Sequence, residues 1–555
     1  MMRAQRLAAV ALLLVACGST AQREKEGPTA SPSPQGTAGS GGNNSTGGTG
    51  GTPTSCELPP PTLVRLTFDE IIASARVLLG DELADEMAAA RERASAFPPL
   101  ASPTEGRVLN RTTFFASDEL AEMAGKHARE RFDLTACDSD DFACVRDYVA
   151  TLGERAFRRP LTEREQLALL EPINQAEALG ADATIGLEYG VQAVFSSPHF
   201  LYRSALGEQP AGSANGVRRL TDYELASALS FFFTGAPPDD TLLSAARTGA
   251  LSSDEHLEAQ VARLLDIPAS RKHFERLLTS YFDFDRLERV IILDAQLTDK
   301  LRATMRTELE ALLATELWSG GVGNLLTSPR ARVDASLAEV YGIAFPPAGA
   351  RPDADGFVAL ELPPTRAGLL MRAGWEAMHS RPDATSVIGR GMGVRRLLCP
   401  PSQTPPDIVP TPEPADVVDA SEQERSAYRM TIPVCKDCHL EIDPFGLALE
   451  DLDRIGRFRT TDRAGRPIDA SATLPPFAGG ATVSGALELS HALPEDRVAL
   501  CLSRSFIAYA RGNVDTTESC EEQTFAQARA EAGDQSFTQI IRQIALSPTF
   551  RLRRE

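Results

Sequence analysis

Residues 220–233 read LTDYELASALSFFF, and this stretch decides the fold class. Thr221 and Glu224 stand three positions apart, which is the spacing of a capping box at the start of a helix. Apolar residues then recur at helical intervals from Leu225 to Phe232. The stretch therefore predicts a helix that begins beside Thr221 and buries one face.

The same pattern occurs twice more, as LTFDE at 66–70 and LTERE at 161–165. Helical periodicity dominates the rest of the chain, and residues 470–483 are the best place for a short extended loop or hairpin. The sequence thus predicts a mainly α, multi-domain helical protein.

A second recurrence is Ser-Pro-x-Phe, at 197–200 and again at 547–550. Each copy follows an apolar, helix-like segment, and a proline biases the residue before it away from the helical conformation. We expect both prolines to interrupt a helix, and Phe200 and Phe550 to fold back onto the core.

Composition divides the chain. The Gly, Ser, Thr and Pro tract after the leader cannot bury enough apolar surface to offset its ordering entropy, so a flexible tether is expected there. Proline-rich spacers follow at 346–352 and 400–414. The expected parts are a leader (1–16), a tether (17–60), helical domains (61–135, 136–210 and 215–345), a cytochrome-c-like domain (360–475) and a C-terminal helical domain (480–555).

The first residues predict export. A basic start at 1–6 precedes an apolar run at 7–14 that is too short to span a bilayer. Leu14-Val15-Ala16-Cys17 resembles a lipobox, which makes Cys17 the expected lipidated residue and the attachment to the membrane. Gly18, rather than an aspartate, follows it, and the resemblance to bacterial lipoproteins then implies the outer membrane. Ordinary signal cleavage near Ala16 or Ala21 is the alternative.

The net charge of the chain limits the classes of partner that it could bind. The net charge is −20 over 555 residues, with nine cysteines among them. This acidity argues against a nucleic-acid partner and against a basic membrane-binding face. In an exported chain, the cysteines outside the lipidation site and the Cys-x-x-Cys pair predict up to three disulfides, with Cys137–Cys144 and Cys501–Cys520 as the local candidates.

Cys435-Lys436-Asp437-Cys438-His439 carries the chemistry. Two cysteines two residues apart, followed at once by histidine, are the attachment pattern of one c-type haem, with the imidazole as proximal iron ligand. Three alternatives stay open: a disulfide between the two thiols, a thioredoxin-like redox pair and a zinc site.

Several motifs together resemble a family. They are RAFRRPLT (155–162), SPHFLYR (197–203), LASALSFFF (225–233), HLEIDPFGL (439–447) and FIAYARG (506–512). In this order the chain resembles the planctomycete and myxobacterial cytochrome-associated exported proteins, a series of consecutive domains of unknown function. The resemblance implies a helical multi-domain body with one cytochrome-like domain, and it supplies no substrate.

The sequence departs from class I cytochromes at the sixth iron ligand. Those proteins usually supply a methionine downstream of the histidine, whereas the last methionine here is Met430, upstream of His439. The distal candidates are His379, which lies where the family often has a histidine, then His491, then Met430 or Met378; an open or water-bound iron is the alternative.

Neighbouring polar residues have possible supporting roles. Asp443 is a candidate hydrogen-bond partner of the His439 ring, with a plain Asp-Pro turn as the alternative. Arg454, Arg457 and Arg459 are candidates for haem propionates or for a surface helix. We expect the remaining histidines to be surface residues, namely His127, His199, His256 and His273.

The sequence therefore favours an exported, lipid-anchored protein that resembles a c-type cytochrome with one haem. Its expected role is electron transfer in the cell envelope, and the sequence does not identify the redox partner. One alternative is a haem oxidoreductase, peroxidase-like or dehydrogenase-associated. Another is a surface binding or scaffold lipoprotein without haem. No nucleophile elbow or dinucleotide-binding loop supports another enzyme class.

Overall fold

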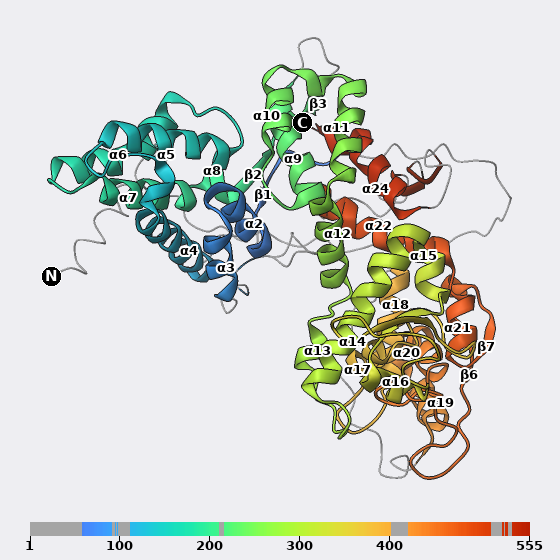
Figure 1. The fold of residues 1–555 in the computed structure, drawn as a ribbon. Helices are drawn as coiled ribbons and strands as arrows, with labels where there is room; N and C mark the ends of the chain where they lie inside the picture. The colour runs from blue at the N-terminus through green and yellow to red at the C-terminus, as the bar shows by residue number, and fades with distance from the viewer. Residues whose placement is uncertain are drawn as a thin grey trace, which may run out of the picture. The chain divides into compact units, whose positions relative to one another are not determined.

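The computed structural model describes residues 58–90, 95, 97, 111–209, 216–400, 420–511, 524–526, 528–530 and 536–554. The leader, nearly all of the tether and the three cysteines Cys17, Cys56 and Cys520 lie outside these residues. Helices make up most of what is described, which confirms the mainly α prediction (Figure 1). Within these residues, no helix is both long and apolar enough to cross a bilayer.

The helices that precede residue 205 share one hydrophobic core, to which Phe231 also belongs. They are α2 (Phe68–Leu79), α3 (Asp81–Ala89), α4 (Arg111–Glu130), η3 (Phe132–Thr135), α5 (Phe142–Phe157), α6 (Glu163–Ala178), α7 (Ala183–Ser196) and α8 (Pro198–Leu201). Helix α7 lies at the centre of this group, because it packs against α4, α5 and α6.

A second hydrophobic core runs from Ala205 to Phe550. Its first helices are α9 (Asp222–Thr234), α10 (Asp240–Arg247), η4 (Ala250–Ser252), α11 (Asp254–Asp266), α12 (Pro268–Tyr281), α13 (Arg286–Arg289), α14 (Asp299–Leu312), the π-helix η5 (Leu313–Leu317), α15 (Trp318–Thr327) and α16 (Ala335–Tyr341). Its later helices are α17 (Ala373–Met378), α18 (Val387–Leu398), α20 (Pro433–Leu447), η7 (Pro476–Ala478), α21 (Ala486–Ala492), α22 (Glu495–Arg511), α24 (Phe537–Leu546) and α25 (Pro548–Arg551). Helix α19 (Glu422–Thr431) packs against α20.

Capping boxes start α2, α6 and α9, as predicted. At α9 the Glu224 N–H donates to Thr221 Oγ1 at 3.2 Å, and the Thr221 N–H donates to Glu224 Oε2 at 3.0 Å. A fourth box, between Ser421 and Glu424, starts α19 and was not predicted. These boxes satisfy backbone donors that the first turn of a helix leaves without partners.

The strands within the described residues pair two by two, all antiparallel. The pairs are β1 (Thr62–Arg65) with β2 (Tyr202–Ala205), β3 (Val217–Arg219) with β8 (Leu552–Arg554), β4 (Arg330–Val333) with β5 (Val358–Glu361), and β6 (Ser471–Thr473) with β7 (Thr482–Ser484). The β6–β7 hairpin confirms the extended segment predicted over 470–483.

Both Ser-Pro turns interrupt a helix as predicted. Ser197 ends α7 and starts α8, and Ser547 does the same between α24 and α25. Phe200 and Phe550 are buried, with 1% and 3% of their surface exposed. In each copy the short helix leads directly into a strand, β2 or β8.

The two copies belong to one repeated frame. In both, a strand runs into a helix with a capping box (β1–α2 and β3–α9), and that strand pairs with the strand after the Ser-Pro turn. The register agrees: Arg65 pairs with Tyr202 in the first frame, and Arg219 pairs with Leu552 in the second. The second frame therefore spans residues 217–554 and encloses the segment that carries the Cys-x-x-Cys-His motif.

Two disulfides join described cysteines. The predicted bond between Cys137 and Cys144 is present. Cys501 pairs with Cys399, 102 residues earlier, so the predicted Cys501–Cys520 pairing is wrong in this structure. The physical reason is helix packing: α18 lies against α22, which brings the Cα atoms of Cys399 and Cys501 to 5.5 Å.

Candidate functional site

Helix α20 carries the Cys-x-x-Cys-His motif. Pro433 occupies its first turn, and only Ile432 separates it from α19. Cys435, Cys438 and His439 are at positions i, i+3 and i+4, so they share one face of the helix. All three are partly buried, and both cysteines carry thiols, so the alternative of a disulfide between them is not formed.

Asp443, one turn further along α20, contacts the His439 ring. Its Nδ1 lies 2.8 Å from Asp443 Oδ1. Asp443 is fully buried, and its other oxygen accepts from Ser426 Oγ at 2.8 Å and from Arg429 Nε at 2.9 Å, both on α19. These two donors hold Asp443 through Oδ2, and its Oδ1 accepts from the ring, which leaves Nε2 of His439 as the nitrogen with a lone pair.

The charge state of Asp443 follows from these contacts. Burial alone raises the pKa of a carboxyl group, but the hydrogen bond from His439, the charge of Arg429 and the hydrogen bond from Ser426 outweigh it. The pKa of Asp443 is therefore lowered, and the group is a carboxylate at neutral pH. This confirms the hydrogen-bonding role considered for Asp443 over the plain turn.

Helix α18 packs closely against α20 through two glycines. A Cβ on Gly391 would lie 2.1 Å from the Ile442 carbonyl oxygen, and one on Gly446 would lie 2.0 Å from the Val387 carbonyl oxygen. These distances leave no room for a side chain, so glycine allows the two backbones to approach. The motif-bearing helix thus has a fixed crossing with its neighbour.

His379 lies on the other side of α18. Cβ atoms on Gly389 and Gly393 would contact the His379 backbone and ring, whereas Gly391 faces α20. Positions 389 and 393 are about one turn apart and 391 lies about 200° from each, so α18 stands between His379 and α20. The structure does not bring this predicted distal ligand to the face of the motif.

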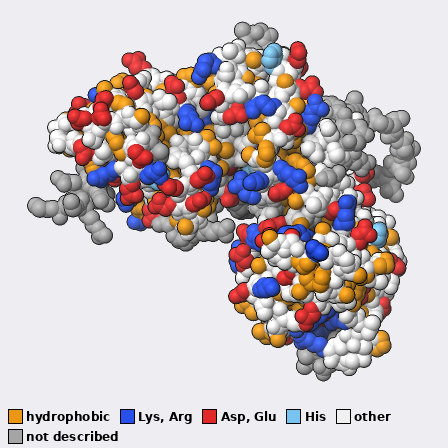
Figure 2. Space-filling view, in the orientation of Figure 1, with side chains coloured by type: hydrophobic (Ala, Val, Ile, Leu, Met, Phe, Trp, Pro, Cys, Tyr) orange, Lys and Arg blue, Asp and Glu red, His pale blue; other side chains and the backbone are white. Residues whose placement is uncertain are grey.

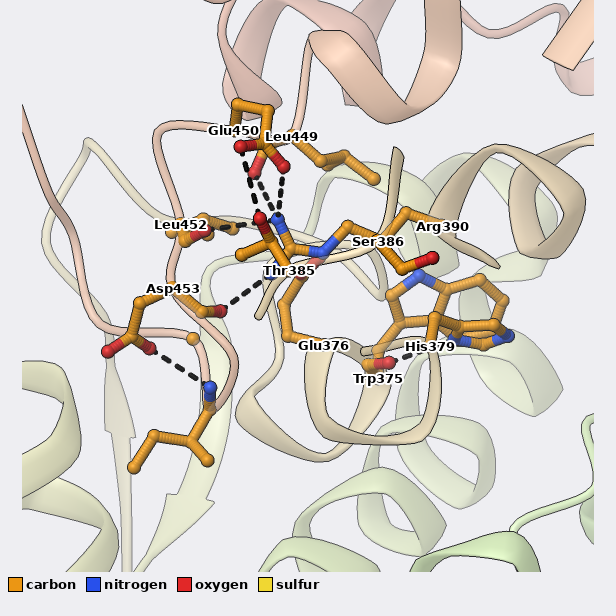
Figure 3. A network of polar contacts seen from close by, with 12 residues as sticks. Trp375, Glu376, His379, Thr385, Ser386, Arg390, Leu449, Glu450, Leu452 and Asp453 are labelled. Carbon is orange, nitrogen blue, oxygen red and sulfur yellow. Dashed lines mark hydrogen bonds and ion pairs between the residues drawn. The ribbon is translucent and has the colours of Figure 1, made fainter. Parts of the chain in front are cut away.

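The surroundings of His379 are those of a structural residue (Figure 3). Its Nδ1 donates to the Trp375 carbonyl oxygen at 2.9 Å, and the two rings lie 4.3 Å apart between centroids. Burial lowers the pKa of His379 to about 4, against the opposing effect of the Trp375 hydrogen bond. The imidazole is therefore neutral at neutral pH.

The other distal candidates occupy three different places. His491 is exposed on α21, which packs against β7 and α15. Met378 is fully buried in the second hydrophobic core. Met430, on α19, lines a cavity together with Pro444 and Leu447 of α20.

The three arginines considered for propionates already have protein partners. Arg454 lies 3.5 Å from Asp294, and Arg457 contacts both Asp294, at 2.5 Å, and Asp453, at 2.6 Å. Arg459 contacts Glu450 at 2.5 Å. They lie after α20 in non-helical chain, so the surface-helix alternative is wrong.

A buried charged network lies beside His379 (Figure 3). Arg390 on α18 is fully buried, and its Nη2 lies 2.5 Å from Glu376 Oε2. The same guanidinium donates to the carbonyl oxygens of Leu449, Leu452 and Asp453, which ties α18 to the chain after α20. Burial raises the pKa of Glu376 to about 8, although Arg390 opposes the shift.

Two histidines expected at the surface are buried. His127 is 8% exposed and His273 is 1% exposed, so that prediction is wrong for both. The reason is helix packing: His127 lies on the inner face of α4, and the ring of His273 lies 5.5 Å from that of Tyr509. His199 and His256 are exposed as expected.

Ser426 and Arg429 are the site residues that the sequence did not reveal. They lie 17 and 14 residues before Asp443, on a different helix. The capping box at Ser421 predicts a helix just before the motif, but only the helix–helix contact shows which of its side chains meet Asp443. Among the described residues, no group of three or more His, Cys, Asp and Glu could hold a bare metal ion, so the zinc alternative gains no support.

Three family models match the chain in succession. Residues 144–204 match PSD5, a protein of unknown function (DUF1595), and residues 220–343 match PSD4, a protein of unknown function (DUF1592). Residues 366–462, which contain α17 to α20, match PSCyt3, a protein of unknown function (DUF1588). No curated protein and no solved structure gave a match.

The matched segments fall within the stretches expected as 136–210, 215–345 and 360–475 and together cover about half of the chain. Domains of these three kinds are associated with cytochrome-c-like proteins. The chain belongs to the family of multi-domain proteins in which these planctomycete-type cytochrome-associated domains follow one another.

Proposed function

We propose that this protein is a monohaem c-type cytochrome-like electron carrier, with His439 as proximal ligand and Cys435 and Cys438 as the thioether anchors. The observation that carries the proposal is the contact between His439 and the buried Asp443. Ligating histidines commonly donate their second ring nitrogen to a carboxylate or carbonyl, which fixes the tautomer and the ring orientation. Here that arrangement is present, and Nε2 is left for iron.

Exposed apolar side chains on α18 and α20 support the proposal of a porphyrin site. Exposed apolar side chains lie on both packed helices: Ile388 and Met392 on α18, and Val434 and Leu440 on α20, each 42% to 49% exposed. In the view of Figure 2, hydrophobic side chains gather in the region where Figure 1 labels α14, α16, α17 and α20. Exposed apolar surface of this kind commonly marks a site that another molecule covers.

When bound, the haem would supply a one-electron iron couple. The protein would set the midpoint potential of this couple. Asp443 accepts a hydrogen bond from the Nδ1–H group and so makes Nε2 a stronger electron donor, which would favour the more highly charged ferric iron. Arg429 partly offsets the carboxylate charge, and Ser426 keeps Asp443 in place.

A carboxylate–histidine pair also suits a haem oxidoreductase that binds a small ligand such as peroxide at an open sixth position. The observation that favours this second candidate is the position of His379, which α18 separates from α20. The two candidates differ in the ferric spectrum: a six-coordinate low-spin iron supports electron transfer, and a high-spin iron supports ligand chemistry.

The proposal includes an exported location. Covalent attachment of c-type haem is expected outside the cytoplasm, and the leader with Cys17 predicts an outer-membrane lipoprotein. The redox partner would then be another envelope protein. Radiolabelled palmitate should label the wild type and not Cys17→Ala.

The direct test is a pyridine haemochrome spectrum of the full chain made with c-type maturation. We expect one covalent haem, lost in the Cys435→Ala/Cys438→Ala variant. Absence of haem from the wild-type protein would contradict both haem proposals and favour a surface binding or scaffold lipoprotein.

Asp443→Asn tests the role of the carboxylate. The amide is a weaker acceptor for the Nδ1 proton, so we expect the midpoint potential to rise by about 60 mV or more, which is tenfold in the redox equilibrium. Asp437→Asn is the matched control, because Asp437 is an exposed carboxylate on the same helix. Equal potentials in the wild type and Asp443→Asn would contradict the assignment.

A further inference from the structure

A cavity of about 310 Å³ lies between α19, α20 and the β6–β7 hairpin. Helix α19 contributes Gln423, Ser426 and Met430 to its lining, and α20 contributes Pro444 and Leu447. This volume is at the lower end of the range of small-molecule pockets, about 300–1,000 Å³. The cavity is distinct from the face of α20 that carries the two cysteines.

The lining predicts an uncharged ligand. Its polar side chains are hydroxyls and one amide: Ser426, Gln423, and Ser471, Thr473 and Thr482 of the hairpin. A charged molecule would find no side chain of opposite charge among the lining residues.

The hydroxyl groups also select for hydrogen-bond donors. Ser426 donates its proton to Asp443 at 2.8 Å, and Ser471 donates to Asp469 at 2.6 Å. Thr473 and Thr482 share one hydrogen bond of 3.1 Å between their hydroxyls. Because these protons are mostly committed within the protein, the oxygens offer lone pairs to a ligand.

The remaining lining is apolar. Met430, Pro444, Leu447 and Ala472 provide carbon surface alongside the hydroxyls. A compact molecule with several hydroxyl groups and a C–H face satisfies both kinds of surface, as a monosaccharide does.

The cavity touches the proposed iron ligand through one residue. Ser426 lines it and also donates to Asp443 Oδ2, and Asp443 Oδ1 accepts from His439. A ligand that donates to Ser426 Oγ polarises this chain of hydrogen bonds. Two contacts of 2.8 Å each therefore connect the lining of the cavity to His439.

We propose that this cavity binds a small neutral polyhydroxyl molecule and that its occupancy tunes the His439 site through Ser426 and Asp443. The binding part stands on the cavity alone. The tuning part rests on the proposed haem function.

The binding test is a saturation-transfer NMR titration of the full chain with D-glucose as probe, and with D-glucuronate as an anion of similar size. We expect saturable binding of glucose, and binding of glucuronate at least tenfold weaker. Absence of saturable glucose binding, or equal binding of both probes, overturns the proposal.

Variants locate the binding. Ala472→Leu adds carbon atoms on the cavity side of β6 and should weaken glucose binding at least tenfold. Ser484→Ala is the matched control, because Ser484 is an exposed hydroxyl residue on β7 of the same hairpin. Glucose binding that Ala472→Leu leaves intact would place the sugar elsewhere and overturn the proposal.

The tuning is measured separately, so that its failure is distinguishable. In haem-loaded protein, saturating glucose should shift the midpoint potential, and the shift should vanish in Ser426→Ala. The Cys435→Ala/Cys438→Ala variant should bind glucose as the wild type does, because neither cysteine lines the cavity. Protein without haem that still binds glucose contradicts the haem function and leaves the binding proposal standing, whereas haem-loaded protein that binds glucose without a potential shift overturns the tuning.

Discussion

At the residue scale, Asp443 shows how a buried charge can be kept in a helical protein. A carboxylate without partners would be neutralised by burial, but Asp443 has three donors at 2.8–2.9 Å. Because the pKa of Asp443 is lowered on folding, its ionised form stabilises the folded state. This stabilisation is complete at pH values above the ordinary pKa of a carboxyl group, and it is lost as the pH falls through the pKa of the folded state.

His379 makes stability depend on pH in mild acid. Its pKa is about 4 when folded, against about 6.5 in an unfolded chain, so the unfolded state binds more protons between these values. Its contribution is therefore complete above pH 6.5 and is lost as the pH falls toward 4, by up to about 3 kcal/mol. We expect urea unfolding between pH 7 and 4.5 to show a smaller loss of stability in His379→Gln.

His491→Gln is the control for this experiment, since His491 is exposed. Its pH dependence should match that of the wild type. A His379→Gln variant with an unchanged acid limb would show that another group titrates there.

Arg158 is the residue on which the first Ser-Pro turn depends. Its guanidinium donates to the carbonyl oxygens of His199, Phe200 and Tyr202 at 2.6–3.1 Å. Arg158→Ala should lower the free energy of unfolding by about 3 kcal/mol or more, because it leaves buried carbonyl groups without donors. Arg159→Ala, at the adjacent and more exposed position, should cost less than about 1 kcal/mol in the same urea titration.

At the element scale, the crossing of α18 and α20 is the contact that positions the motif. Gly391→Ala would place a methyl group against the Ile442 carbonyl and force the helices apart. We expect a loss of about 1–3 kcal/mol in unfolding free energy and an altered haem spectrum. Met392→Ala, on the exposed side of the same helix, is the control for stability and should change the free energy of unfolding little. An equal loss of unfolding free energy in both variants would argue against the crossing as the cause.

Tight turns are a second feature at this scale. Asp353, Asp453 and Asp462 each accept hydrogen bonds on their side chains from the backbone N–H two and four positions later. In each case the residue three positions after the aspartate is a glycine with φ between +76° and +86°. The Asp-x-x-Gly spacing is thus a local signal of a turn that sequence reading can recognise.

At the scale of the whole molecule, the hydrophobic cores do not follow the expected domains one for one. The second core draws on residues from 215–345, 360–475 and 480–555 together. The repeated frame accounts for this, because β3 and β8 close it across more than 300 residues of chain. A hydrogen bond of 2.8 Å from Tyr509 to Glu70 links α22 to α2 in the same way.

The Cys399–Cys501 disulfide closes a loop that contains the whole motif. A loop of 102 residues restricts the unfolded chain more than the seven-residue loop of Cys137–Cys144. Replacing both cysteines by alanine should therefore cost on the order of 2 kcal/mol more at the first site than at the second, by denaturant titration. Equal losses would indicate that strain or residual structure dominates.

The sequence by itself determined the features that depend on a few neighbouring residues. The capping boxes, the helix breaks at both Ser-Pro pairs, the β6–β7 hairpin and the shared face of Cys435, Cys438 and His439 follow from residues within about a dozen positions. The contact of the first Ser-Pro turn with Arg158, more than 40 residues earlier, does not. Five motifs in order also sufficed to indicate the family, three of whose domain models match the chain.

Only the tertiary structure decided what joins distant helices. It paired Cys501 with Cys399, set Ser426 and Arg429 on Asp443, and placed α18 between His379 and the motif. These contacts depend on which faces of separate helices meet, and side chains 14 to 102 residues apart carry no local signal of their partner. Neighbouring residues therefore determine the helix that bears the motif, whereas the packing of separate helices determines which side chains surround it.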